Sequence, residues 1–235
     1  VHSSQLVNCR FQRATLMGCA TSSPASQAPK VLEITRVSAP VPEIAMPVEQ
    51  HSQDITALCG FFQDSTLYKP DAMQGLRFIA VNQGIVWIVG TDDGKVWWTV
   101  EGQIKQVEPV ILELDFSSKG GPAEFISTYE DNKLTHADGS AWLQCTATGS
   151  WLRPQNLPSR DDRDTGGLYV DPELFTGGFK GLRAMSVRKG AELSDAMTVI
   201  GSDDGTSWWA ARGRVVQQEP LVAVLDLSSA GGLRN

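Results

Sequence analysis

The stretch Gly90-Thr91-Asp92-Asp93-Gly94-Lys95-Val96-Trp97-Trp98 returns later in the chain as Gly201-Ser202-Asp203-Asp204-Gly205-Thr206-Ser207-Trp208-Trp209. Asp-Gly tolerates the positive φ that a tight turn needs, so each copy predicts a β-hairpin. Adjacent tryptophans in register beside the same turn rarely arise by chance. The chain therefore contains a tandem repeat of one domain.

The match extends to both sides of this hairpin in the same order. Gly75-Leu76-Arg77 corresponds to Gly181-Leu182-Arg183, and Glu108-Pro109 corresponds to Glu219-Pro220. Further on, Asp115-Phe116-Ser117-Ser118-Lys119-Gly120-Gly121 matches Asp226-Leu227-Ser228-Ser229-Ala230-Gly231-Gly232. The first copy continues from Ala123 to Cys145 without a counterpart in the second. We therefore expect the second unit to be incomplete, with an uncovered sheet edge. Either the sequence is a fragment of a longer chain, or another chain completes the unit.

Each unit has the pattern of short antiparallel strands. Between Val110 and Phe116 apolar and polar residues alternate, which is typical of a half-buried strand. A second Asp-Gly turn, Asp138-Gly139, predicts another hairpin in the first unit. Regular short strands, roughly seven per unit, and no helical pattern predict a sandwich or a small barrel. The expected fold is all-β, with two tandem antiparallel sheet units.

The 235 residues divide into four expected parts. Residues 1–57 form a disordered, proline-containing N-terminal arm, and residues 58–147 form the first β unit. Residues 148–165 are a polar linker, and residues 166–235 form the second β unit, which is truncated. Within the arm, the apolar piece Val31-Leu32-Glu33-Ile34 fits a plain linker, a peptide motif or an added edge strand.

The order of these motifs resembles a repeat that is common in predicted proteins of dinoflagellate algae. The resemblance rests on the aromatic-x-Asp-Pro opening, Gly-Thr-Asp-Asp-Gly, Trp-Trp, Asp-Phe-Ser-Ser-Lys-Gly-Gly-Pro and Ala-Asp-Gly-Ser-x-Trp. It covers both units but not the arm, and the second unit departs from it at Ala230 and in the final hairpin. The family has no characterised function, so the resemblance implies no catalytic residues.

Charge and hydropathy exclude several classes of function. The formal net charge is −7 and no basic run occurs, which argues against a nucleic-acid partner. No apolar stretch is long enough to span a bilayer, and the first thirty residues lack a signal-peptide core. We therefore expect an intracellular protein, either cytoplasmic or held peripherally on a membrane.

A candidate lipidation site lies at residues 17–22. Met17-Gly18-Cys19-Ala20-Thr21-Ser22 matches the N-myristoylation pattern if translation begins at Met17. Cys19 would then take a palmitoyl chain beside the acylated Gly18, and two chains make a stable anchor. The alternative is that Met17 is internal and the match is fortuitous.

The sequence offers no motif for catalysis, a metal or a cofactor. His136 stands alone on a predicted strand, and no G-x-S-x-G, H-E-x-x-H or P-loop pattern occurs. The Asp-Asp pairs fit turn geometry better than acid–base chemistry or calcium binding. Cys59 and Cys145 bracket the first unit, and we expect them to be thiols, although barrel closure would bring them close.

The tryptophan pairs are the candidate binding residues. Because alternate strand residues share a face, Trp98 and Trp209 are expected in the core. Trp97 and Trp208 then share the opposite face with Glu101 and Arg212, which mark it as outward. There the two indoles are candidates to stack on a sugar ring or a partner side chain. The alternative is that the two units pack together through these faces.

The function expected from these features is a nonenzymatic binding or protein-interaction module, with a protein or carbohydrate partner and no cofactor. One alternative is a hydrolase-like enzyme that uses acidic residues in a barrel mouth. Another is a small-ligand carrier with an internal apolar cavity. Carboxylates that converge in a pocket would favour the enzyme, whereas carboxylates scattered on turns would favour the module.

Overall fold

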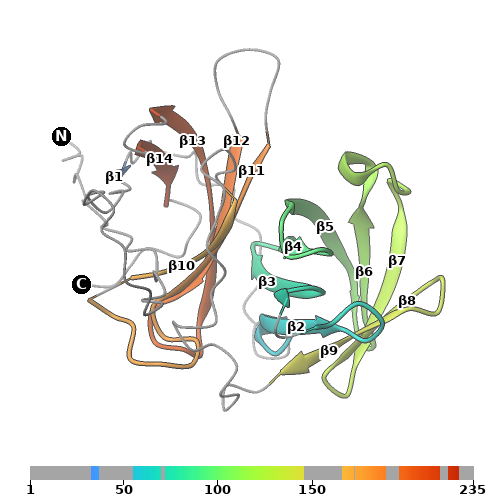
Figure 1. Cartoon of the computed structure of the whole chain (residues 1–235). Coiled ribbons are helices and arrows are strands. Elements are labelled where there is room, and N and C mark those ends of the chain that lie inside the picture. Colours follow the sequence, from blue (N-terminus) through green and yellow to red (C-terminus); the bar gives the residue numbers. More distant parts are fainter. Residues whose placement is uncertain are drawn as a thin grey trace.

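The computed structural model describes residues 33–36, 55–69, 72–145, 166–171, 173–188, 196–217 and 222–227. Its named elements are fourteen β-strands and one short 3₁₀ turn, η2 (Ser117–Lys119), which confirms the all-β class (Figure 1). They form two sheets, one from each repeat unit. In the described part of the chain, no helix has the length and apolar character needed to cross a membrane.

The first unit is a closed barrel of eight antiparallel strands, one more than the sequence suggested. The strands are β2 (Gly60–Asp64), β3 (Leu76–Asn82), β4 (Ile85–Thr91), β5 (Trp97–Val107), β6 (Val110–Asp115), β7 (Phe125–Glu130), β8 (Lys133–His136) and β9 (Ala141–Cys145). Neighbours in sequence pair in turn, and β9 returns to pair with β2, which places Cys145 opposite Phe61. The structure thus selects the barrel over the sandwich.

The predicted hairpins and alternation account for these strands. Gly94 and Gly139 adopt φ values of 75° and 84°, so both Asp-Gly turns use the left-handed backbone that glycine permits. In β6, Val110, Leu112 and Leu114 are buried, while the residues between them are partly exposed. The inside of the barrel is filled by apolar and aromatic side chains, namely Leu58, Phe62, Ile79, Val86, Ile88, Val100, Val110, Leu112, Leu114, Tyr129, Leu134 and Trp142.

The second unit repeats the first five strands of the barrel as an open sheet. Its antiparallel strands are β10 (Gly167–Val170), β11 (Leu182–Arg188), β12 (Ala196–Ser202), β13 (Trp208–Gln217) and β14 (Val222–Asp226). Even the irregularity is repeated, because the register shift between Ile104 and Gln106 in β5 recurs between Val215 and Gln217 in β13.

The edge of this open sheet carries a strand from the N-terminal part of the chain. β1 (Glu33–Arg36) pairs with β14 in parallel, with Glu33 opposite Val222 and Arg36 opposite Leu225. In the barrel, the equivalent strand β6 pairs at this edge with β7, and that pairing is antiparallel. β1 thus matches the edge-strand interpretation of the apolar piece in the arm.

The two sheets lie back to back. Figure 1 shows the sheet of β11, β12 and β13 beside the barrel. β13 lies against β3, β11 against β5 and β12 against β4. Because β11, β12 and β13 are the repeat equivalents of β3, β4 and β5, this exchange is the pattern of a two-fold axis within one chain. The shared core is formed by the outer faces of both units and comprises Phe61, Met73, Leu76, Phe78, Ala80, Trp87, Val89, Trp97, Leu168, Val170, Phe179, Leu182, Ala184, Ile200 and Ala210.

Candidate functional site

The candidate binding residues Trp97 and Trp208 lie in the core shared by the two units. Trp97 is 8% exposed and Trp208 is half-buried. Phe78 contacts both indoles, with ring centroids 6.4 Å from Trp97 and 6.0 Å from Trp208. Both residues lie on the outer face of their sheets, as the strand parity predicts. The expectation that this face is exposed to solvent is wrong for Trp97, because the opposite sheet covers it. This placement favours the packing alternative over a free stacking surface.

The charged residues used to mark that face meet at its rim. Arg212 donates a hydrogen bond to Glu101, and its guanidinium lies 4.4 Å from the ring centroid of Trp87. Glu101 and Arg212 occupy equivalent positions in the two units. If the units were identical, the two-fold axis between them would bring two like charges together here. Because one position is acidic and the other basic, the two residues form an ion pair instead.

Trp98 and Trp209 pack on the inner faces of their own sheets, as their strand parity predicts. Both are half-buried, so they pack against the edge of the core that was expected to enclose them. The two rings are partly exposed because Trp98 and Trp209 lie at the start of β5 and β13, at one end of the barrel and of the second sheet. Gly90 and Gly201 make room for the rings, since a Cβ there would lie within 2.8 Å and 2.7 Å of indole carbons.

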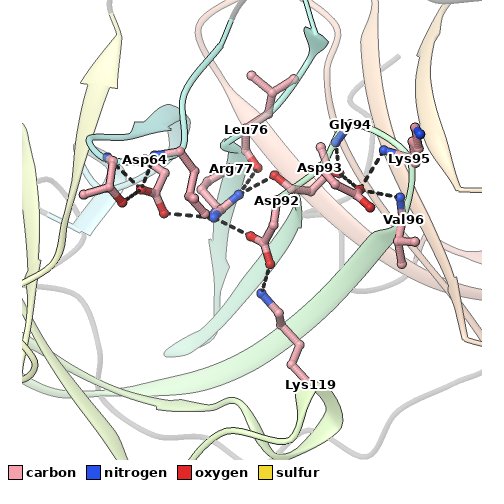
Figure 2. A network of polar contacts seen from close by, with 12 residues as sticks. Asp64, Leu76, Arg77, Asp92, Asp93, Gly94, Lys95, Val96 and Lys119 are labelled. Carbon is pink, nitrogen blue, oxygen red and sulfur yellow. Dashed lines mark hydrogen bonds and ion pairs between the residues drawn. The ribbon is translucent and has the colours of Figure 1, made fainter.

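A buried arginine holds this end of the barrel together. The Arg77 side chain is 2% exposed and lies between two carboxylates, at 3.0 Å from Oδ2 of Asp64 and 2.6 Å from Oδ1 of Asp92 (Figure 2). Its Nη1 donates to the carbonyl oxygens of Leu76 and Thr91 at 2.9 Å and 2.6 Å. Charge-assisted bonds on several sides compensate the burial of the guanidinium.

The two aspartates of the Asp-Asp-Gly turn have separate structural tasks. Asp92 binds Arg77, whereas Asp93 Oδ1 accepts from the backbone N–H groups of Lys95 and Val96, both at 2.8 Å. Burial acts to raise the pKa of Asp93, but these hydrogen bonds outweigh it and lower the pKa. The turn carboxylates are thus committed to backbone geometry and to the arginine.

Lys119 adds a second cation from the loop after β6. Its Nζ donates to Asp92 Oδ2 at 2.7 Å (Figure 2). The same Nζ lies 3.7 Å from the ring centroid of Trp98. Burial lowers the pKa of Lys119, opposed by the bond to Asp92. The guanidinium of Arg77 is 4.8 Å from the Trp98 ring and 5.1 Å from the Trp142 ring, so cations contact both indoles.

A ring cluster continues from these indoles across the barrel end. His136 is 4% exposed, with its ring centroid 4.4 Å from Trp142 and 5.3 Å from Phe125. His136 Nδ1 and Ser127 Oγ share a hydrogen bond of 2.7 Å, and burial lowers the pKa of His136 to about 4. We call this set of side chains the aromatic end of the barrel: Arg77, Trp98, Phe116, Phe125, His136 and Trp142.

The second unit repeats this arrangement of a buried arginine between two carboxylates, which we call the arginine clamp. Arg183 donates to the carbonyl oxygens of Leu182 and Ser202 at 2.9 Å and 2.8 Å, and it forms ion pairs with Asp203 and, at 3.6 Å, with Asp171. Asp204 caps its turn as Asp93 does, accepting from Thr206 and Ser207. The clamp is therefore a property of the repeat.

The remaining predicted residues contribute no further chemistry to this site. Gly18 and Cys19 lie outside the described residues. Cys59 and Cys145 are free thiols, and burial raises the pKa of each to about 11. In the described part of the chain, no three His, Cys, Asp or Glu side chains gather where they could hold a metal ion.

Sequence reasoning missed several residues of the aromatic end. Arg77 was visible as part of the repeated Gly-Leu-Arg motif, and Lys119 as a position that differs between the units, but neither signalled burial. His136 stands alone on its predicted strand and Trp142 follows the second Asp-Gly turn, and neither pattern indicates that the two rings meet. Their meeting depends on barrel closure.

Searches against models of known families, curated proteins and solved structures find no match to this chain.

Proposed function

We propose that the protein is a nonenzymatic interaction module whose second sheet takes up extended peptide strands at its β14 edge. The observation that carries this proposal is the parallel pairing of β1 with β14. Backbone hydrogen bonding to an exposed sheet edge is a common mode of peptide recognition. Here the barrel is closed, so the open second sheet is the unit with an edge to offer.

The acidic residues support a module over an enzyme. Asp64 accepts hydrogen bonds from Thr66 and Leu67 as well as from Arg77. Burial acts to raise its pKa, but the bonds from Thr66, the Arg77 charge and the bond from Leu67 together lower it. A carboxylate held as an ion by such partners is a poor general acid. The filled barrel interior likewise supports a module over an apolar carrier.

Peptide binding in trans tests the strand-addition proposal. A double variant, Ile34→Pro with Thr35→Pro, removes two consecutive backbone N–H donors from β1. Because successive N–H groups of a strand point to opposite sides, one of the two removed donors is the one that faces β14. A fluorescein-labelled peptide of residues 31–38 should then bind this full-length variant saturably in fluorescence anisotropy. The unmodified chain should bind at least about tenfold more weakly, because its tethered strand competes at high effective concentration.

The controls separate strand pairing from unspecific adhesion. The same peptide carrying both prolines should not bind either chain, and a scrambled peptide of the same composition should bind more weakly. If the labelled peptide fails to bind the double-proline chain while that chain keeps its thermal transition, the strand-addition proposal is wrong.

The acylation motif belongs to the same proposal as a means of placing the module on a membrane. Chains on Gly18 and Cys19 would together give stable peripheral attachment. Metabolic labelling with an alkyne myristate should mark the native protein, and Gly18→Ala should abolish the label. Detection of peptides from residues 1–16 in the mature protein would refute initiation at Met17.

A further inference from the structure

The aromatic end of the barrel contains three buried polar atoms that have no hydrogen-bond partner among the described residues. They are Nε of Arg77, Nε1 of Trp98 and Nε2 of His136. Arg77 and His136 are 2% and 4% exposed, so water does not reach these side chains from the surface. Buried polar groups in proteins are nearly always paired, and a concentration of unpaired ones in one cluster calls for an explanation.

The second unit shows how the same motif satisfies its tryptophan. There Trp209 Nε1 donates to Asp203 Oδ1 at 3.3 Å. In the barrel the equivalent carboxylate, Asp92, is already engaged by Arg77 at 2.6 Å and by Lys119 at 2.7 Å. The indole N–H of Trp98 is thereby left for another acceptor. The unpaired donor is a feature of the barrel and not of the repeat motif.

The charges around the cluster balance. Arg77 and Lys119 supply two positive charges, and Asp64 and Asp92, joined to them by ion pairs, supply two negative charges. A charged ligand would bring an uncompensated charge into a buried place, which is costly. The three unpaired atoms are two N–H donors and one imidazole nitrogen. Hydroxyl groups suit them, because a hydroxyl both accepts and donates.

The walls of the cluster are flat rings. Phe116 lies among the others, with centroids 6.3 Å from Trp98, 5.3 Å from Phe125 and 6.3 Å from Trp142. Phe116, Trp98 and Phe125 are half-buried, so this is where the cluster meets the surface. Aromatic faces combine apolar contact with polar edges, an arrangement that fits the apolar face of a sugar ring.

The segment Phe116–Gly121 covers the cluster, since Phe116 and Lys119 both contact the Trp98 ring. It leaves β6 through η2, turns back at Gly120 with φ of 80°, and is fastened to the body of the barrel by Lys119. We propose that the aromatic end binds one neutral sugar ring, with the side chain of Phe116 moving aside. The ring would pack against the half-buried side chains Trp98, Phe116 and Phe125, while its hydroxyls meet Arg77, Trp98 and His136.

The test is binding of methyl glycosides to the full-length protein by saturation-transfer NMR. Methyl glycosides of glucose, galactose, mannose and N-acetylglucosamine are the probes, and sodium benzoate is the charged aromatic comparison. At least one glycoside should bind, and benzoate should not. Trp98→Phe keeps an aromatic ring but removes the N–H, so it should weaken glycoside binding about five- to tenfold, the usual effect of losing one hydrogen bond.

Trp209→Phe in the second unit is the matched control and should leave glycoside affinity unchanged. Thermal unfolding of both variants checks that the fold is kept, and Ser127→Ala, which frees His136, provides a second variant expected to change affinity. The proposal is overturned if no glycoside binds the unmodified chain, or if the two phenylalanine variants affect binding equally. Peptide anisotropy on the same samples reports strand addition separately, so failure of one activity is distinct from failure of the other.

Discussion

The Arg77 cluster of the barrel and the Arg183 cluster of the second sheet begin from the same motifs, but they use their polar atoms differently. In the second sheet Asp203 serves both Arg183 and Trp209. In the barrel Lys119 donates a hydrogen bond to Oδ2 of Asp92. The residue of the second unit that aligns with Lys119 in the sequence is Ala230. One added cation thus redirects a carboxylate and leaves an indole N–H unpaired inside the barrel.

The two units also differ in how they end their sheets. The barrel continues through β7, β8 and β9 and closes on β2, so its strands have neighbours on both sides. Among the described residues, β14 is the last strand of the second sheet, and it pairs in parallel with β1. Of the described strands, those of the first unit thus form a closed barrel with a filled apolar interior, whereas those of the second unit form an open sheet that packs on the barrel.

The largest difference between the units should appear when each arginine is removed. Arg77→Met leaves the buried carboxylate of Asp64 without its cation, and breaking a buried pair costs about 3–5 kcal/mol. Arg183→Met should cost less, because Asp171 and Asp203 are 16% and 30% exposed and water can reach them. Urea denaturation of both variants measures the two losses. Equal losses would contradict the stronger clamp in the barrel.

Replacing the tryptophans of the shared core should affect both units together. Trp97→Ala removes a buried indole from between the sheets and should cost about 3 kcal/mol, the lower part of the range for large aromatics. Trp208→Ala should cost less, because Trp208 is half-buried. Hydrogen exchange should then show faster opening in the second sheet as well as in the barrel for either variant. Loosening confined to the mutated unit would argue against a shared core.

Acid should weaken the barrel selectively through His136. Burial lowers its pKa from 6.5 to about 4, so its contribution to stability is complete above pH 6.5 and is lost as the pH falls through 4. The loss between pH 7 and pH 4 should be about 3 kcal/mol at most. His136→Gln should flatten this part of the pH dependence of urea unfolding. An unchanged slope in that variant would show that His136 does not carry it.

The smallest effect is expected at the rim of the interface. Glu101→Arg places two arginines side by side at the pseudo-two-fold axis, but both positions are largely solvated, so the loss should be under about 1 kcal/mol. Adding Arg212→Glu restores an ion pair of reversed polarity and should recover most of the loss. A double-mutant cycle with no coupling energy would mean that the ion pair contributes nothing to the packing of the sheets.

Local patterns predicted the strands, and distant contacts determined the site. Asp-Gly turns and the alternation in β6 were sufficient for the hairpins, since both depend on neighbouring residues. Barrel closure joins Phe61 to Cys145 across the whole first unit, and no local pattern encodes that pairing. Arg77 was hidden for a related reason. A charged residue is normally exposed, and the burial of Arg77 is compensated only because Asp64 at the end of β2 and Asp92 in the turn after β4 lie beside it.

The sequence could not decide whether the two outer faces are exposed or pack against each other, and the reason is physical. Trp97 and Trp208 lie beside charged residues on their strands, which is also the pattern of a solvated face. Strand period identifies which residues share a face but not what covers that face. The second unit supplies the cover, and the charged neighbours are accommodated at the rim as a cross-unit pair.

The back-to-back packing of the repeats is tested most directly by contacts between Phe78 of the barrel and Trp208 of the second sheet. Their ring centroids lie 6.0 Å apart, close enough for proton–proton cross-relaxation between ring edges. A nuclear Overhauser spectrum of the full-length protein, with phenylalanine and tryptophan selectively labelled, should show cross-peaks between these two rings that vanish in Phe78→Leu. Cross-peaks confined to pairs within each unit, with Trp208 seen only by residues of its own sheet, would contradict the shared core.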